Sequence, residues 1–138
     1  DFIGEPPTNF FPAELDKSGE HPVLRAKGAA LTFAVPLARG RHLANRGQRD
    51  FIVGLRPQNL HLDGADDGRG GRDDALHAEV AINEYVGEQT ILTLVAGGYR
   101  FRAQAHAETS LGRGDRAHLR YAREDVMVFD AQTEALIP

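Results

Sequence analysis

A strict alternation of apolar and polar residues near the middle of the chain constrains its fold more than any other feature. Tyr99, Phe101, Ala103, Ala105 and Ala107 are apolar, and every position between them carries a polar side chain. Successive side chains of a β-strand point to opposite faces, so a period of two is typical of a half-buried strand. We therefore predict a strand over residues 99–107.

The residues just before this strand predict its hairpin partner. Residues 90–96 (TILTLVA) are rich in Thr and branched apolar side chains, which favour strands. Gly97 and Gly98 connect the two segments, and glycines can adopt the positive φ angles of a tight hairpin turn. The sequence thus predicts a β-hairpin over residues 90–107.

Further segments of strand length are spread along the chain. Residues 76–83 match the strand period better than the helical one. Strands are also predicted at residues 10–15, 30–35, 51–55, 116–121 and 126–129, with a turn at 122–125 between the last two. Pro12 indicates an edge strand or an early position within its strand. Strand-sized runs separated by turns predict an all-β barrel or sandwich.

The length of 138 residues fits one domain. Residues 63–74 are polar and glycine-rich, which predicts a mobile loop. This loop divides the chain into halves that would each have a thin core, so we expect a single domain over residues 1–138. The first residue is Asp rather than Met, and we expect the chain to be a piece of a longer product.

Several chemistries are excluded by what the sequence lacks. It has no cysteine, which excludes disulfides and thiolate metal sites and fits a reducing compartment. No apolar run approaches the roughly 20 residues of a membrane span, and no signal peptide is recognised at the start. Phosphate-loop, dinucleotide and nucleophile-elbow motifs are missing, so we predict no catalytic residue and no enzymatic activity for this chain.

Two features suggest a metal site at first sight, and neither fits one. The chain has six histidines, but no two are three or four residues apart, as helical metal ligands are. Residues 63–74 resemble a calcium loop in composition only, because Ala65 and Asp74 occupy ligand positions 3 and 12 of that pattern. We predict no metal site.

A basic stretch raises the alternative of nucleic-acid binding. Residues 21–49 contain six basic residues (Arg25, Lys27, Arg39, Arg41, Arg46 and Arg49) and no acidic one. Single-stranded nucleic acid also requires exposed aromatic side chains on which bases stack. Only Phe33 lies in this stretch, and it alternates like a core residue. We therefore favour a solvated face or one that binds an acidic partner, and we predict no nucleic-acid partner.

Four segments, taken in order, resemble one protein family. They are residues 2–12 (FIGEPPTNFFP), 53–60 (VGLRPQNL), 79–90 (EVAINEYVGEQT), and 111–115 (LGRGD) followed by 128–133 (VFDAQT). Together they resemble the C-terminal TOBE (transport-associated OB) domain of carbohydrate-type ABC importer ATP-binding subunits. Within that family, the segments resemble those of the maltose, glycerol-3-phosphate and trehalose importer ATPases. The resemblance spans nearly the whole chain.

The resemblance implies an OB-like (MOP-like) small β-barrel with short irregular connections. It implies a regulatory and dimerisation domain that is itself non-catalytic, in a subunit whose missing upstream nucleotide-binding domain would hold ATP and Mg²⁺. Residues 1–12 would form the junction with that domain. The implied partners are a second copy of the subunit, the upstream domain and the transporter's membrane subunits. The implied location is cytoplasmic, at the inner face of the cell membrane through the transporter complex.

The same resemblance points to five candidate interaction or regulatory residues: Arg56, Gln58, Glu88, Gln89 and Thr90. The family usually has Glu after its Arg-Pro pair and a Gly-x-Glu-Thr motif, where this chain has Gln58 and Gln89. An amide keeps hydrogen bonding but loses a salt-bridge partner, so regulatory contacts built on those carboxylates would change. The alternative is that Arg56 and Thr90 only satisfy polar groups of the barrel itself.

A second hypothesis from another class is a stand-alone barrel that binds a small ligand, such as an oxyanion or a sugar phosphate. Related transport-associated barrels bind oxyanions. Backbone N–H groups around Gly87, Gly112 and Gly114 could supply the donors.

Overall fold

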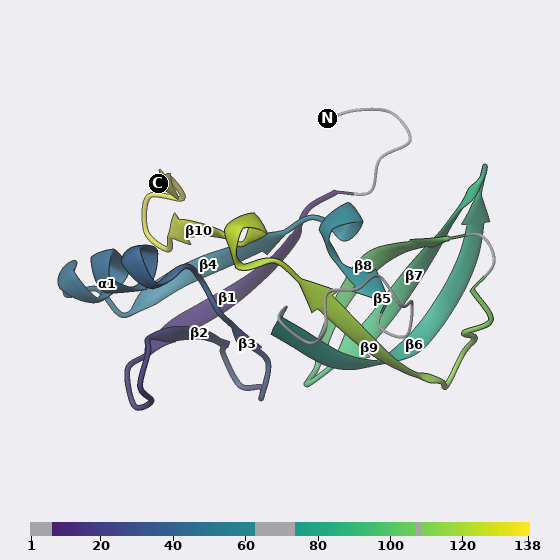
Figure 1. Cartoon of the computed structure of the whole chain (residues 1–138), viewed down its shortest axis with the longest axis horizontal. Coiled ribbons are helices and arrows are strands. Elements are labelled where there is room, and N and C mark those ends of the chain that lie inside the picture. The colour runs from purple at the N-terminus through teal and green to yellow at the C-terminus, as the bar shows by residue number, and fades with distance from the viewer. Residues whose placement is uncertain (1–6, 63–73, 107–108) are drawn as a thin grey trace.

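The computed structural model describes residues 7–62, 74–106 and 109–138, and the side chain of His106 is excepted. Residues 1–6 of the predicted junction, 63–73 of the predicted loop and Ala107 at the end of the predicted hairpin lie outside these ranges. Asp74, the last residue of that loop, begins a strand. The described part of the chain forms two β-sheets and one α-helix (Figure 1).

The first sheet has six strands in the order β11-β10-β4-β1-β2-β3. Its strands are β1 (Asn9–Asp16), β2 (Val23–Ala26), β3 (Thr32–Phe33), β4 (Asp50–Leu55), β10 (Met127–Asp130) and β11 (Leu136–Ile137). Every neighbouring pair in it is antiparallel. Helix α1 (Leu37–Asn45) buries Leu43 in the core.

The second sheet has five antiparallel strands in the order β5-β9-β6-β7-β8. Its strands are β5 (His61–Leu62), β6 (Asp74–Val86), β7 (Gln89–Ala96), β8 (Tyr99–His106) and β9 (Arg116–Tyr121). The predicted hairpin is therefore confirmed as β7 and β8. Gly97 and Gly98 in its turn have φ angles of 57° and 86°, as the two-glycine link requires.

The chain crosses between the sheets twice. One crossing is the 3₁₀ turn η1 (Pro57–Asn59) after β4, and the other is the 3₁₀ turn η2 (Arg123–Asp125) before β10. Because β4 and β10 are neighbours in the first sheet, the second sheet is a continuous insertion between them. The sequence places the division at residues 63–74, whereas the structure places it at the two crossings.

An aromatic cluster joins the sheets in a shared core. The ring of Phe11 on β1 lies 4.9 Å from that of Phe33 on β3 and 5.5 Å from that of Phe101 on β8, between centroids. Phe33 in turn lies 6.3 Å from Tyr121 on β9. All four side chains are buried. Such contacts between aromatic rings stabilise a core beyond the area that they bury.

Asn9 adds a polar clamp between the sheets. Its side-chain amide donates to the carbonyl oxygen of Arg102 over 2.8 Å, and its Oδ1 accepts from the N–H of Arg102 over 2.9 Å. These are the two bonds that a neighbouring strand would make to β8. The residue belongs to the TNFF part of the first segment that carries the family resemblance, so that motif has a structural role.

Two regions differ from the sequence-based expectation. The strand predicted over residues 30–35 is limited to the two residues of β3. Helix α1, which was not predicted, has neither a side-chain N-cap nor an acidic first turn, and it includes Gly40. Its local signals are therefore weak, and packing of Leu43 into the core determines it. Strands β2, β5 and β11 were also not predicted.

Pro12 shows how a proline fits inside the first sheet. It lies opposite Ile52 of β4, and its carbonyl oxygen accepts from the N–H of Lys27 over 2.9 Å. Pairing between β1 and β2 begins only at Ala13. The missing N–H of Pro12 thus points past the end of β2. Pro12 is the fourth of eight residues in an interior strand, so the edge or early position that the sequence indicates is not found.

Replacing Asn9 with alanine should destabilise the protein by about 1–3 kcal/mol, because the backbone groups of Arg102 lose both partners. Urea unfolding followed by circular dichroism measures this. Asn9→Asp replaces the donor with a carboxylate oxygen that faces the carbonyl of Arg102 at a buried position, so its loss at neutral pH should be at least as large as that of Asn9→Ala. Asn45→Ala at the exposed end of α1 is the control. Equal stabilities for the Asn9→Ala and Asn45→Ala variants would contradict a role for the clamp.

Candidate functional site

The five predicted interaction residues lie in two separate elements. Arg56 and Gln58 are exposed at η1, the first crossing between the sheets. Glu88, Gln89 and Thr90 lie at the tip of the β6–β7 hairpin. Figure 1 shows this tip at the end of the second sheet farthest from α1. The structure therefore offers two candidate contact points rather than one joint site.

Thr90 differs from the other four because it is fully buried, with 0% of its surface exposed. It lies opposite Tyr85 and Ala105 in the sheet. Its hydroxyl has no hydrogen-bond partner among the described residues. Thr90 is thus buried inside the hairpin, whereas the side chains of Arg56, Gln58, Glu88 and Gln89 are exposed to solvent.

The glycine donors considered for an oxyanion are largely engaged within the protein. The N–H of Gly112 donates to Oδ2 of Asp115 over 2.8 Å, and the N–H of Gly114 donates to the carbonyl of Val80 over 2.8 Å. Gly114 has a φ of 91° and Gly87 one of 66°, so both mark turns. An oxyanion at this loop would have to compete with these bonds.

Four of the six basic residues in the stretch 21–49 pair with acids from other parts of the chain. Lys27 pairs with Asp50 over 3.0 Å and Arg49 with Glu14 over 2.6 Å. The remaining pairs are Arg25 with Asp16 and Arg46 with Asp130, and Arg39 donates to the carbonyl of Val126. The positive charge that favoured a nucleic-acid groove is therefore locally compensated, which weakens that alternative.

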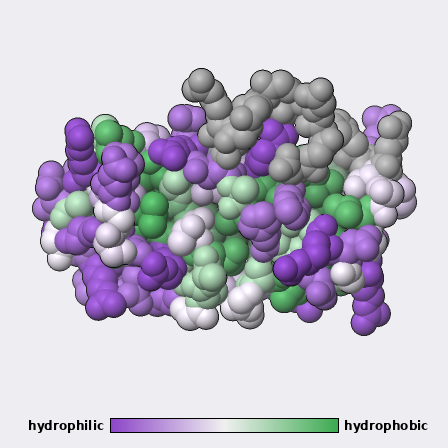
Figure 2. Space-filling view, turned by 60° about the horizontal axis from the view of Figure 1, so that its bottom comes forward, coloured by the Kyte–Doolittle hydropathy of each residue, from purple (hydrophilic) through white to green (hydrophobic). Residues whose placement is uncertain are grey.

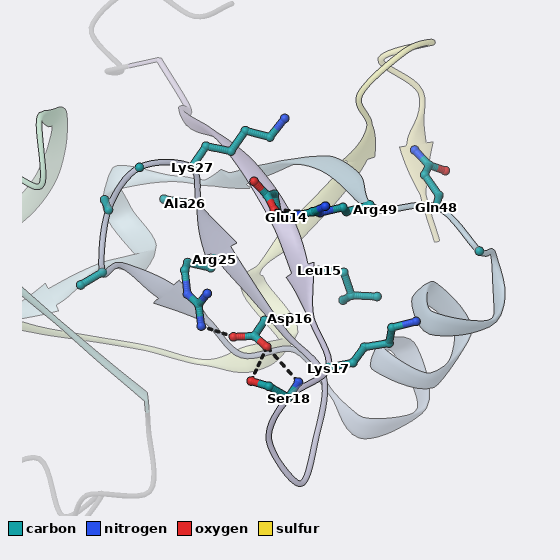
Figure 3. A pocket seen from close by; sticks show the side chains of 14 residues that line it. Glu14, Leu15, Asp16, Lys17, Ser18, Arg25, Ala26, Lys27, Gln48 and Arg49 are labelled. Atoms are coloured by element: carbon teal, nitrogen blue, oxygen red, sulfur yellow. Dashed lines mark hydrogen bonds and ion pairs between the residues drawn. The ribbon is translucent and has the colours of Figure 1, made fainter.

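A groove of about 960 Å³ runs along the ends of β1 and β2 and the segment between α1 and β4 (Figure 3). Its lining includes the paired residues Glu14, Asp16, Arg25 and Arg49. Hydrogen bonds from the hydroxyl and the N–H of Ser18 hold the pKa of Asp16 below its usual value, and Arg25 lowers it further. The charged groups in this groove thus hold strand ends together.

A second cavity of about 460 Å³ lies between the two sheets. Tyr121 lies in its lining, and its hydroxyl oxygen accepts from the N–H of Ala34 over 2.9 Å. Asp74 and Arg123 lie there too and form an ion pair over 2.7 Å. Burial raises the pKa of Tyr121 to about 12. The phenol therefore stays neutral at physiological pH and serves as a structural acceptor.

The described residues hold no group of three or more potential ligands that could bind a metal ion. His77 and His118 do face each other across β6 and β9, with ring centroids 4.4 Å apart. This juxtaposition could not be read from their spacing in the sequence. Among the helices in the described ranges, none is long and apolar enough to cross a membrane.

The geometry defines an all-β domain of the OB-like class, and the comparisons with known proteins specify its family. The sequence profile of the TOBE domain matches residues 53–129, which is more than half of the chain. This chain belongs to the TOBE domain family. The match covers the second sheet together with parts of β4 and β10, the strands at which the chain leaves and re-enters the first sheet.

Curated relatives match nearly the whole chain. An ABC transporter ATP-binding protein of Bacillus subtilis, YurJ, is 27% identical over 99% of the chain. The multiple sugar-binding transport ATP-binding protein MsmK of Streptococcus mutans is 31% identical, also over 99% of it. The chain spans 36% and 35% of these two relatives, about a third of their length. The family resemblance that the sequence motifs predict is confirmed.

A solved structure confirms the OB-like fold. The cytoplasmic molybdate-binding protein ModG, in a crystal form with molybdate bound, superimposes with a TM-score of 0.63. The similarity covers 87% of this chain and 94% of ModG at 19% sequence identity. At this identity the likeness shows a shared fold.

The raised pKa of Tyr121 predicts a specific loss of stability at high pH. In the unfolded chain the phenol ionises near its ordinary value of 10, whereas in the fold it stays neutral up to about 12. Tyr121 therefore leaves the free energy of unfolding unchanged below pH 10. As the pH rises from 10 to 12, ionisation of the unfolded chain lowers this free energy by roughly 2 kcal/mol.

Urea unfolding between pH 9 and 12 tests this prediction in three proteins. The Tyr121→Phe variant should lose less stability across this range than the wild type, because it lacks the titrating group. Tyr85→Phe, at an exposed tyrosine, should follow the wild-type profile. A constant difference between wild type and Tyr121→Phe from pH 9 to 12 would show that Tyr121 is not held neutral by the fold.

Proposed function

We propose that this chain is the C-terminal regulatory and dimerisation domain of the ATP-binding subunit of an ABC importer for sugars or related solutes. The observation that carries the proposal is the match of 99% of the chain to ATP-binding proteins of ABC transporters, one of which is named for multiple sugar-binding transport. The TOBE family membership supports the same assignment.

The chain itself would be non-catalytic. It spans about a third of its relatives, and its sequence contains no phosphate-binding loop. ATP and Mg²⁺ would bind to a nucleotide-binding domain in the rest of the subunit. The domain would hold two subunits together while the nucleotide-binding domains open and close on ATP. Through the transporter's membrane subunits it would lie at the cytoplasmic face of the membrane.

The mass and activity of the native gene product test this proposal. An antibody against this chain should detect a protein about three times its 15.1 kDa in source-cell lysate, and this protein should sediment with membranes. The purified product should hydrolyse ATP. A 15 kDa soluble product without ATPase activity would refute the proposal and favour a stand-alone binding module.

The exposed candidates at η1 and at the hairpin tip are the proposed contact residues for dimerisation. Arg56→Ala combined with Gln89→Ala should weaken self-association of the subunit by roughly tenfold, as expected for the loss of about 1.4 kcal/mol of polar contacts. Sedimentation velocity over a range of concentrations measures the shift. Unchanged sedimentation with a folded circular-dichroism spectrum would count against these contacts.

A matched control uses the same residue types on other surfaces. Arg41→Ala on α1 combined with Gln132→Ala in the turn before β11 removes one exposed arginine and one exposed glutamine. This control should associate like the wild type.

Oxyanion binding remains the second candidate, because ModG has a similar fold and binds molybdate. The engaged N–H groups of Gly112 and Gly114 argue against a ready-made site at that loop. Titration calorimetry with molybdate, sulfate and sugar phosphates tests this candidate. The main proposal expects no heat of binding to this chain at millimolar ligand.

A further inference from the structure

Part of the outer face of the first sheet is apolar across four neighbouring strands, and the charged residues Glu14, Arg25 and Asp50 lie beyond it on the same face. In one row Phe10 of β1 lies opposite Gly54 of β4, which lies opposite Met127 of β10. In the next row on the same face, two residues away along each strand, Pro12, Ile52, Phe129 and Leu136 follow one another across β1, β4, β10 and β11. We call these seven residues the outer apolar face.

This face is open to solvent in the structure. Phe10 is 57% exposed and Leu136 is 58% exposed. Pro12 is also exposed, and Ile52, Met127 and Phe129 are partly buried. The opposite face of the same strands carries core residues such as Phe11 and Val53, and α1 lies on the core side through Leu43. Contiguous exposed apolar residues of this kind mark an interaction surface.

Gly54 has no side chain, so the rings of Phe10 and Phe129 can pack over the backbone in the middle of the face. The rings of Phe10 and Phe129 lie edge to face, with centroids 5.7 Å apart. A Cβ at Gly54 would approach Cε1 of Phe129 to 2.9 Å and Cε1 of Phe10 to 3.3 Å. The glycine thus allows the edge-to-face pair to pack close to the backbone of β4, and the rings remain part of a continuous apolar surface.

The outer face of the second sheet shows what a solvated sheet surface looks like in the same chain. Side chains exposed on it include His77, Glu79, Arg116 and His118, which lie opposite one another on β6 and β9. An antiparallel sheet with one solvated face normally carries polar side chains there. Figure 2 likewise shows hydrophilic residues over much of the surface in that view. The outer apolar face departs from this pattern.

The first and last strands among the described residues both contribute to the outer apolar face. Phe10 is the second residue of β1, the first described strand. Leu136 begins β11, the last strand, and Ile137 lies opposite Val128, one residue from Met127. In Figure 1 the start of β1 and the C-terminus lie toward the same side of the molecule. A domain attached at either end would therefore emerge next to this surface.

We propose that the outer apolar face is the docking surface for the rest of the ATP-binding subunit, the two thirds of the curated relatives that this chain does not span. This inference rests on the proposed function. It identifies the surface that fixes the regulatory domain on its own subunit. Apolar contact across a sheet face would hold the two parts in one orientation, in the manner of an interdomain interface.

Cysteine labelling tests the proposal, because this chain contains no cysteine of its own. Leu136→Cys places a thiol in the outer apolar face, and Arg41→Cys places one at an exposed position of α1. Each variant is prepared as the 138-residue chain and as the whole subunit. Maleimide modification is timed and located by peptide mass mapping, so that cysteines elsewhere in the subunit do not interfere.

The proposal expects Leu136→Cys to react at least about tenfold more slowly in the whole subunit than in the 138-residue chain, the change for an interface worth about 1.4 kcal/mol locally. Arg41→Cys should react equally in both. Equal rates for Leu136→Cys in a subunit that hydrolyses ATP would overturn the inference and leave the proposed function intact. A product without ATPase activity would instead remove the proposed function on which the inference rests.

A second measurement distinguishes the proposed occupant, the rest of the subunit, from a second copy of this chain. If labelling of Leu136→Cys in the 138-residue chain alone slows as its concentration rises, a second copy covers the face, and the proposal is wrong.

A further variant, Leu136→Glu, should leave the thermal midpoint of the 138-residue chain unchanged and should make the whole subunit more sensitive to limited proteolysis. Arg41→Glu is its control and should change neither. Unchanged proteolysis of Leu136→Glu would also count against the proposal.

Discussion

The packing of Phe11 against both sheets is the contact on which the rest of the structure depends. Its ring is 1% exposed and lies within 5.6 Å, between centroids, of Phe33 in the first sheet and of Phe101 and Tyr99 in the second. A single curled sheet of this size would leave its concave face open to water, and small domains have little core to spare. The two sheets are therefore stable only as a pair.

The order of the strands along the chain links the two sheets into one unit. The second sheet is inserted between β4 and β10, which are hydrogen-bonded neighbours, so the chain must enter and leave it at adjacent positions. The clamp of Asn9 on Arg102 lies near the first crossing, and the bond from Ala34 to Tyr121 lies near the second. A contact made at η1 would thus act on both sheets, as the proposed regulatory role requires.

The sequence predicted what depends on neighbours along the chain and missed what depends on contacts in space. The alternation at residues 99–107 and the Gly97–Gly98 turn are local signals, and both were confirmed. Helix α1 lacks local signals and follows from the packing of Leu43. The basic stretch appeared unpaired because its acidic partners, such as Glu14 and Asp130, lie outside it. The five candidate residues came from the family resemblance, and their separation into η1 and the β6–β7 hairpin needed the structure.

The strands of the first sheet also contain an apolar pattern that is explained by the structure and not by the sequence alone. Residues 10–13 (FFPA), 51–55 (FIVGL) and 126–129 (VMVF) are continuous apolar runs without alternation. Such runs are typical of strands that are covered on both faces. In this chain one face is covered by the shared core, whereas Phe10 and Leu136 on the other remain open. The sequence of these strands is thus typical of a sheet that is covered on both faces, whereas the described residues cover only one face. Docking of the rest of the subunit, as proposed above, would supply the second cover and would explain why apolar residues stand on both faces of these strands.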